Sequence, residues 1–163
     1  MSTNKNNFSK KSIDVCKILL GMIGERIVAS YLRKNGHNVE ESLNVFDMEK
    51  DMLVDGNKVE VKTQVPIVIE DSFGVTPSQM MKIKGSHRVY FVSVPLQNSN
   101  DELEGAIFEL DPADPMLKAH RWTTHKGREM ICFPRRQTAM KIIHHITDEK
   151  ILKQLKMLST SYM

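Results

Sequence analysis

Residues 50–64, KDMLVDGNKVEVKTQ, constrain the fold most, because they have the pattern of a β-hairpin. Apolar and polar residues alternate on both sides of Asp55-Gly56-Asn57, a sequence typical of tight turns between antiparallel strands. We place Asp55 and Gly56 at the two central turn positions. The predicted cross-strand pairs are then Val54 with Asn57, Leu53 with Lys58, Met52 with Val59, and Asp51 with Glu60.

This register brings two carboxylates and a lysine to one face of the hairpin. Asp51 and Glu60 become direct cross-strand neighbours, with Cβ atoms about 5 Å apart. Lys62 lies on the same face as Glu60, because side chains on a strand repeat every second residue. The opposite face carries the apolar residues that we expect in the core: Met52, Val54, Val59 and Val61.

Carboxylates held this close repel each other, and a divalent cation between them removes the conflict. Mg²⁺ prefers oxygen ligands and recruits phosphate oxygens of a substrate. Lys62 beside such a cation could activate a water molecule or stabilise charge on a phosphate, which is the chemistry of phosphodiester hydrolysis. The alternative is an exposed hairpin whose acids are solvated beside lysines. Asp47 competes for the role of first acid, and another turn register would promote Asp55.

The segment before the hairpin has the pattern of a helix that contains an acid. In residues 21–42, apolar side chains recur at helical spacing up to Asn35-Gly36, which is a typical stop, and Glu25 lies inside. With the hairpin, this order resembles the PD-(D/E)xK nuclease superfamily over residues 20–95. The chain has Lys50-Asp51 where the family name has Pro-Asp. The matching residues are Gly24-Glu25, Tyr31-Leu32, Gly36, Asp51 and Glu60-Val61-Lys62.

The resemblance implies a restriction-endonuclease-like core, an α/β fold in which helices flank a central mixed sheet, here with an added C-terminal hairpin and helices. It implies that Asp51, Glu60 and the Val61 carbonyl bind Mg²⁺, with Mn²⁺ as a substitute. Lys62 would assist the attacking water, and Glu25 would hold a second metal or its water shell. Gln64 continues the face of Glu60, so it would contact a metal-bound water or the substrate, or else be a polar residue near a strand end.

The implied activity is that of a metal-dependent endodeoxyribonuclease. Within this class, the chain is similar in size and motif order to small Holliday-junction resolvases, which act on branched DNA. A different class remains open, a catalytically silent nucleic-acid-binding module with the same fold. An RNA nuclease is a third hypothesis, because the same metal chemistry hydrolyses the phosphodiester backbone of either DNA or RNA.

The charge distribution is consistent with a nucleic-acid partner. The chain has a net charge of +3. Its two ends are basic: residues 1–20 hold four lysines against one aspartate, and residues 120–163 hold nine basic residues against three acidic ones. Basic side chains neutralise phosphates in such complexes. The candidates for contacts with DNA are Lys10, Lys11, Lys17, Arg121, Lys126, Arg128, Arg135 and Arg136.

Length and composition predict one domain over residues 12–163, after a disordered tail at 1–11, and the resemblance implies that it is a nuclease domain. Its core covers about residues 20–95, and a C-terminal extension covers about 106–163. No stretch approaches the roughly 20 apolar residues that span a bilayer. Cys16 and Cys132 are too few for a disulfide scaffold or a zinc site, so we expect a reducing, cytoplasmic location. A homodimer is an open alternative to a monomer.

The remaining patterns predict further elements. Thr76 and Pro77 open a helix as its cap and first residue, and Thr147-Asp148 has the pattern of another helix start. A stripe of Ile151, Leu152, Leu155 and Leu158 either packs on the domain or pairs with a second subunit. We expect helices at 12–34 with a break at Gly21, at 77–83, and two within 137–158; strands at 39–45, 51–55, 58–65, 88–94, 106–110, 122–124 and 129–133; and a polar loop at 96–105.

Overall fold

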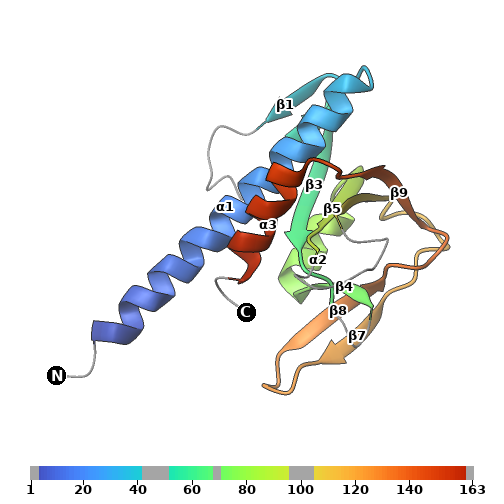
Figure 1. Cartoon of the computed structure of the whole chain (residues 1–163). Helices are drawn as coiled ribbons and strands as arrows, with labels where there is room; N and C mark the ends of the chain where they lie inside the picture. Colours follow the sequence, from blue (N-terminus) through green and yellow to red (C-terminus); the bar gives the residue numbers. More distant parts are fainter. Residues whose placement is uncertain (1–3, 42–51, 68–70, 96–104, 161–163) are drawn as a thin grey trace.

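The computed structural model describes residues 4–41, 52–67, 71–95 and 105–160, which form a mixed α/β fold (Figure 1). Two sheets and three helices occur within these residues. In chain order the elements are α1 (Asn4–Lys34), β1 (Val39–Glu41), β2 (Met52–Val54), β3 (Asn57–Gln64), β4 (Ser72–Val75), α2 (Pro77–Lys84), β5 (Arg88–Ser93), β6 (Ala106–Leu110), β7 (His120–Thr123), β8 (Glu129–Pro134), β9 (Met140–His145) and α3 (Glu149–Thr160).

The central sheet has six strands in the order β1-β2-β3-β5-β6-β9. Only β3 and β5 are parallel neighbours, and the other pairs are antiparallel. Parallel neighbours need a crossover connection, and this one contains α2. All of β5 after Arg88 is buried, as its near-continuous apolar sequence predicts for a central strand.

The predicted hairpin register is confirmed for the described residues. Met52 pairs with Val59, and Val54 pairs with Asn57. Asp55 and Gly56 have φ angles of 50° and 81°, as a two-residue turn of type I′ requires. Asp51 lies outside the described residues, so its pairing with Glu60 stays a prediction.

The two faces of the central sheet are covered by different elements. On one face, α1 packs against a core that includes Val59, Val61 and Val92. The other face meets α2 and the second sheet, whose strand order is β4-β8-β7. There Phe73 of β4 stacks on Phe91 of β5 with ring centroids 4.6 Å apart. The strand face that carries Glu60 and Lys62 belongs to this second side, because Lys62 is in register with Phe91.

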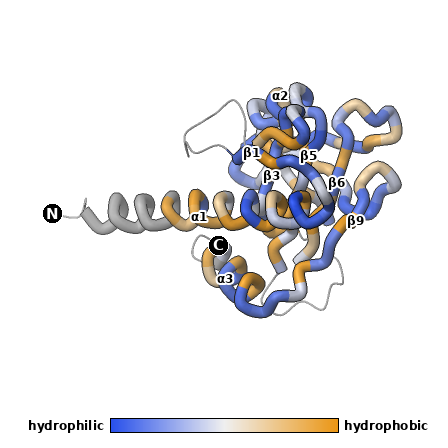
Figure 2. The backbone as a smooth tube through the Cα atoms, turned by 90° about the horizontal axis from the view of Figure 1, so that it is seen from above, coloured by the Kyte–Doolittle hydropathy of each residue, from blue (hydrophilic) through white to orange (hydrophobic). Residues whose placement is uncertain are grey.

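Helix α1 differs from the prediction at its start. It begins at Asn4, so residues 4–11, which we expected to be a disordered tail, continue the helix, and Gly21 does not break it. Extending an existing helix costs much less than nucleating one, and residues 4–20 contain neither proline nor glycine. Figure 2 shows a hydrophobic stretch in the part of α1 that reaches beyond the sheets. The exposed apolar side chains there are Val15, Ile18 and Leu19.

The C-terminal region corrects one prediction and confirms others. Residues 140–145, assigned to a helix from the sequence, form strand β9, which pairs with β6 at the edge of the central sheet. The next helix does begin where expected: Asp148 Oδ1 accepts hydrogen bonds from the backbone of Lys150 and Ile151 at 2.9 and 3.2 Å. Helix α3 lies along α1 (Figure 1) and buries Leu155 and Leu158, so the predicted stripe packs within the domain.

Two further sequence assignments agree with the described strands. The predicted second hairpin is formed by β7 and β8, and the predicted first edge strand begins at Val39. Thr76 caps α2 with Pro77 in its first turn, also as predicted. No described helix is both long and apolar enough to cross a membrane.

Candidate active site

The candidate site centres on two charged side chains of β3. Glu60 is buried, with 1% of its side chain exposed, and Lys62 retains 18%. The Lys62 ammonium forms an ion pair with Glu60 Oε1. The two-residue spacing on a strand places both on one face, and the parallel neighbour β5 supplies Val89 and Phe91 beside them. The carboxylate therefore sits in an apolar environment with a cation next to it.

A pocket of about 280 Å³ lies beside Lys62, where β3 ends. Four elements contribute to it: α1, β3, β4 and α2. The pocket connects the Glu60–Lys62 pair to the molecular surface, because Lys62 is one of its lining residues. The described lining residues are Lys17, Leu20, Lys62, Thr63, Gln64, Gly74 and Gln79.

Two glutamines in this pocket are held by backbone contacts. Gln64 Nε2 donates to the Gly74 carbonyl at 3.1 Å, and Gln64 Oε1 accepts from the Gly74 amide at 2.9 Å. Gln79 Oε1 accepts from the Thr76 amide at 2.9 Å, which completes the cap of α2. Both side chains therefore have fixed orientations. The predicted contact of Gln64 with a metal-bound water or substrate stays a prediction, and its observed contacts join β3 to β4.

Helix α1 reaches the end of β3 through a glycine. At Gly24 the helix lies so close to Thr63 that an added Cβ would be 1.6 Å from the Thr63 hydroxyl oxygen. Glu25, the predicted helical acid, follows in the chain and is half-buried. Its helix packs on the face of β3 opposite Glu60, and Lys17 is the charged α1 side chain that lines the pocket with Lys62. The sequence predicts that Lys17 contacts DNA but does not indicate that it lines the same pocket as Lys62.

The predicted metal ligands are only partly described. Glu60 is buried next to Val61, which is also buried, while Asp51 lies outside the described residues. Among the described residues, no group of three or more His, Cys, Asp or Glu side chains is arranged to hold a metal ion. The carboxylate of Glu60 is a hard oxygen donor of the type that Mg²⁺ prefers. A second acid beside it depends on the predicted position of Asp51.

The predicted DNA-contacting residues fall into three groups. Arg121, Lys126 and Arg128 are exposed on the β7–β8 hairpin. Lys17 is exposed on α1, and Lys10 and Lys11 lie on the first turns of that helix. The last two, Arg135 and Arg136, both bind the carboxylate of Asp71.

Arg135 departs from its predicted role as a surface phosphate ligand. Its side chain is buried, and its Nε donates to Asp71 Oδ1 at 2.9 Å. Its backbone amide also donates to the Asp71 carbonyl at 3.1 Å. The ion pair with Asp71 accounts for the charge of Arg135 inside the protein. Arg136 is exposed and shares the same carboxylate through its own Nε, also at 2.9 Å.

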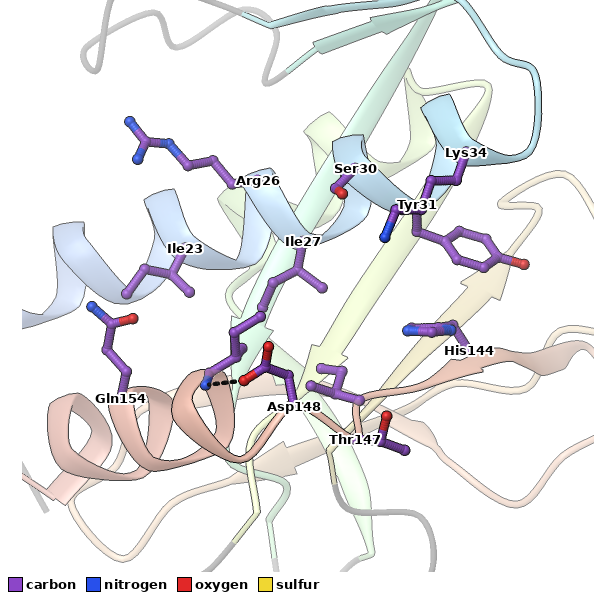
Figure 3. A pocket seen from close by; sticks show the side chains of 12 residues that line it. Ile23, Arg26, Ile27, Ser30, Tyr31, Lys34, His144, Thr147, Asp148 and Gln154 are labelled. Atoms are coloured by element: carbon purple, nitrogen blue, oxygen red, sulfur yellow. Dashed lines mark hydrogen bonds between the residues drawn. The ribbon is translucent and has the colours of Figure 1, made fainter.

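A second pocket, of about 520 Å³, lies between α1, α3 and the end of β9 (Figure 3). Isoleucines form much of its wall, and Tyr31 and His144 meet there with ring centroids 5.0 Å apart. In Figure 3, Asp148 points between α1 and α3 and accepts the backbone hydrogen bond that caps α3. Neither Glu60 nor Lys62 lines this pocket, so it is separate from the candidate site within the described structure.

Comparison of the chain with protein-family models, curated proteins and solved structures found no match.

Proposed function

We propose that this protein is a metal-dependent endodeoxyribonuclease of the PD-(D/E)xK type, with a restriction-endonuclease-like core. One observation carries the proposal: a buried carboxylate, Glu60, pairs with Lys62 on a strand that ends at a pocket open to solvent. A carboxylate and a lysine in this arrangement can bind a cation and stabilise charge on a phosphate.

The order and arrangement of the elements support the proposal. Helix α1 precedes the hairpin β2–β3, and helices flank a central mixed sheet, as the resemblance implies for this core. The hairpin register is the predicted one up to the pair of Met52 with Val59. In the same register, the next pair would be Asp51 with Glu60, which would supply the second acid.

In the proposed site, Asp51, Glu60 and the Val61 carbonyl would hold Mg²⁺, and the bound ion would supply a nucleophilic water of lowered pKa. Lys62 would orient that water or neutralise charge on the scissile phosphate. Lys17 lies on another wall of the same pocket and adds a second positive charge next to the phosphate position.

A catalytically silent nucleic-acid-binding module remains the second candidate, and one observation favours it. The Lys62 ammonium already compensates the charge of Glu60 by direct contact, so this acid does not require a metal to be stable in its buried position. Such a protein would bind DNA without cleaving it in any divalent metal.

The test is a cleavage assay on supercoiled, linear, nicked, flap and cruciform DNA in Mg²⁺ or Mn²⁺. Glu60→Gln and Lys62→Met should each reduce cleavage by at least about 10²-fold, since each removes a metal ligand or a group that stabilises the transition state. Glu41→Gln is the matched control, because Glu41 also pairs with a basic side chain, Arg33, but on β1 away from the pocket. Wild-type levels of cleavage by Glu60→Gln would reject the site.

The substrate panel separates the candidates. Faster cleavage of cruciform DNA than of all other forms would indicate a junction resolvase. Binding without cleavage by the wild type, in every metal, would establish the silent module. Cleavage of a matched RNA duplex tests the third hypothesis, a nuclease that acts on RNA.

A further inference from the structure

The hairpin of β7 and β8 has no role in the proposed catalytic chemistry, yet it carries a concentrated positive charge. From Pro115 to Arg128 the chain contains no acidic residue. The first acid afterwards, Glu129, pairs with Arg121 across the hairpin at 2.7 Å. The basic and imidazole side chains in this segment are Lys118, His120, Arg121, His125, Lys126 and Arg128.

The outer part of this hairpin is a ribbon of only two strands. Strand β4 pairs with β8 as far as Ile131, so residues 122–130 extend beyond the third strand. Within this ribbon, Trp122 pairs directly with Met130, a large cross-strand pair that stabilises its base. Figure 1 shows the ribbon reaching away from the central sheet on the side where β3 ends.

The tip of the ribbon has a defined conformation. The Thr124 amide donates to the Arg128 carbonyl at 2.8 Å, and the Arg128 amide donates to the Thr124 hydroxyl at 3.0 Å. Gly127 has a φ of +80°, the left-handed position found in three-residue hairpin loops. His125, Lys126 and Arg128 therefore project from an ordered turn, and within the described chain neither Lys126 nor Arg128 has an ion-pair partner.

We propose that residues 122–130 form an arm that enters the major groove of duplex DNA, with Lys126 and Arg128 at the contact. This inference rests on the proposed function and specifies the substrate as B-form duplex. The major groove of B-DNA, about 12 Å wide, admits a two-stranded ribbon. The major groove of A-form RNA is deep and too narrow for side chains to read, so the same arm selects against an RNA duplex.

The test measures binding by fluorescence anisotropy in EDTA, where cleavage cannot occur. Substrates are a 24-bp DNA duplex, the RNA duplex of the same sequence, and the DNA duplex with glucosylated hydroxymethylcytosine, which fills the major groove. The arm variant is Lys126→Gln with Arg128→Gln. Its matched control is Lys150→Gln with Lys153→Gln, which removes two exposed charges from α3.

We expect the arm variant to bind plain DNA at least about tenfold more weakly, and the control to bind within twofold of the wild type. The wild type should bind glucosylated DNA and duplex RNA as weakly as the arm variant binds plain DNA. A ligand that fills the minor groove should leave binding unchanged. Circular dichroism and melting temperature establish that both variants are folded.

The inference is overturned if the arm variant binds plain DNA within twofold of the wild type, if the α3 control loses as much affinity, or if glucosylated DNA binds as tightly as plain DNA. These outcomes are distinct from a failure of the proposed function. A protein that never cleaves DNA, but loses affinity in the arm variant, refutes the nuclease and supports the arm.

Discussion

Gly24 allows α1 to approach β3 closely, and Gly24→Ala should therefore destabilise the protein. The added methyl carbon would lie 1.6 Å from Thr63 Oγ1 and 2.8 Å from Thr63 Cβ. Rotation of the threonine side chain can move the hydroxyl away, but Cβ stays in place. To reach an ordinary contact of 3.4 Å, helix and strand must separate by about 0.6 Å, the difference between 3.4 and 2.8 Å.

The size of the destabilisation expected for Gly24→Ala follows from two opposing effects. Overpacking a tight contact typically costs about 1–3 kcal/mol, and the upper end applies because Thr63 Cβ is attached to the backbone of a strand paired within the sheet. Replacing glycine by alanine inside a helix returns about 1 kcal/mol. We expect a net loss of about 2 kcal/mol in the free energy of unfolding, or a melting temperature lower by about 4–8 °C.

Gly21 provides the control within the same helix. A Cβ at Gly21 would meet no atom within 4 Å. Gly21→Ala should therefore raise the free energy of unfolding by about 1 kcal/mol, through the higher helix propensity of alanine alone. In a Thr63→Gly background, Gly24→Ala should become stabilising by the same amount, which gives a coupling of about 3 kcal/mol in a double-mutant cycle. Thermal and urea unfolding measure all of these variants. If Gly24→Ala stabilises the protein as Gly21→Ala does, or if its cost persists without Thr63, then Thr63 does not limit the size of the side chain at position 24.

Two other predictions concern ion pairs. The hydrogen bond from His37, at 2.7 Å, lowers the pKa of Asp55 below its ordinary value of 3.8. The Asp55 carboxylate therefore stabilises the fold above pH 3.8, and this contribution is lost as the pH falls through the lower pKa of the folded state. In acid unfolding curves, Asp55→Asn should flatten the loss of stability below pH 3.8. Asp71→Asn should lower the free energy of unfolding by about 2 kcal/mol or more, since it leaves the buried Arg135 guanidinium without its carboxylate. Glu129→Gln, which breaks an exposed ion pair, should lower it by less than about 1 kcal/mol. Equal losses in urea unfolding would contradict the importance of burial for the pair of Asp71 with Arg135.

The hairpin could be predicted because its determinants are local. Asp55-Gly56 specifies the turn, the turn specifies the register, and the register places Glu60 and Lys62 on one face. The cap of α2 at Thr76 could be predicted for the same reason, because its donor and acceptor are three residues apart. Each of these features depends on interactions within a few positions of the chain.

The features that the sequence did not predict depend on distant partners. Residues 140–145 contain two isoleucines between polar residues, a pattern compatible with either a helix or a strand. The segment forms a strand because it pairs with β6, which lies about 35 residues earlier in the chain. The burial of Arg135 could not be predicted, because its partner, Asp71, lies 64 residues away in the chain and the local sequence does not indicate the ion pair. The burial of Glu60 likewise depends on distant elements, because Val89 and Phe91 of β5, which lie beside the ion pair, belong to the core formed with β4 and α2.

The contact between Glu60 and Lys62 connects the fold to the proposed chemistry. Burying a carboxylate and an ammonium costs free energy that their attraction recovers only in part, and well-packed apolar side chains in such positions are often equally or more stabilising. The apolar neighbours Val89 and Phe91 would accommodate such side chains. Lys62 also remains connected to solvent through a pocket that a second lysine lines, an arrangement that stability does not require. An ion pair that adds little to stability, beside a pocket lined by two lysines, is understandable where the charges act on a bound phosphate. For this reason, the cleavage rate of Glu60→Gln tests the proposal more directly than any unfolding measurement.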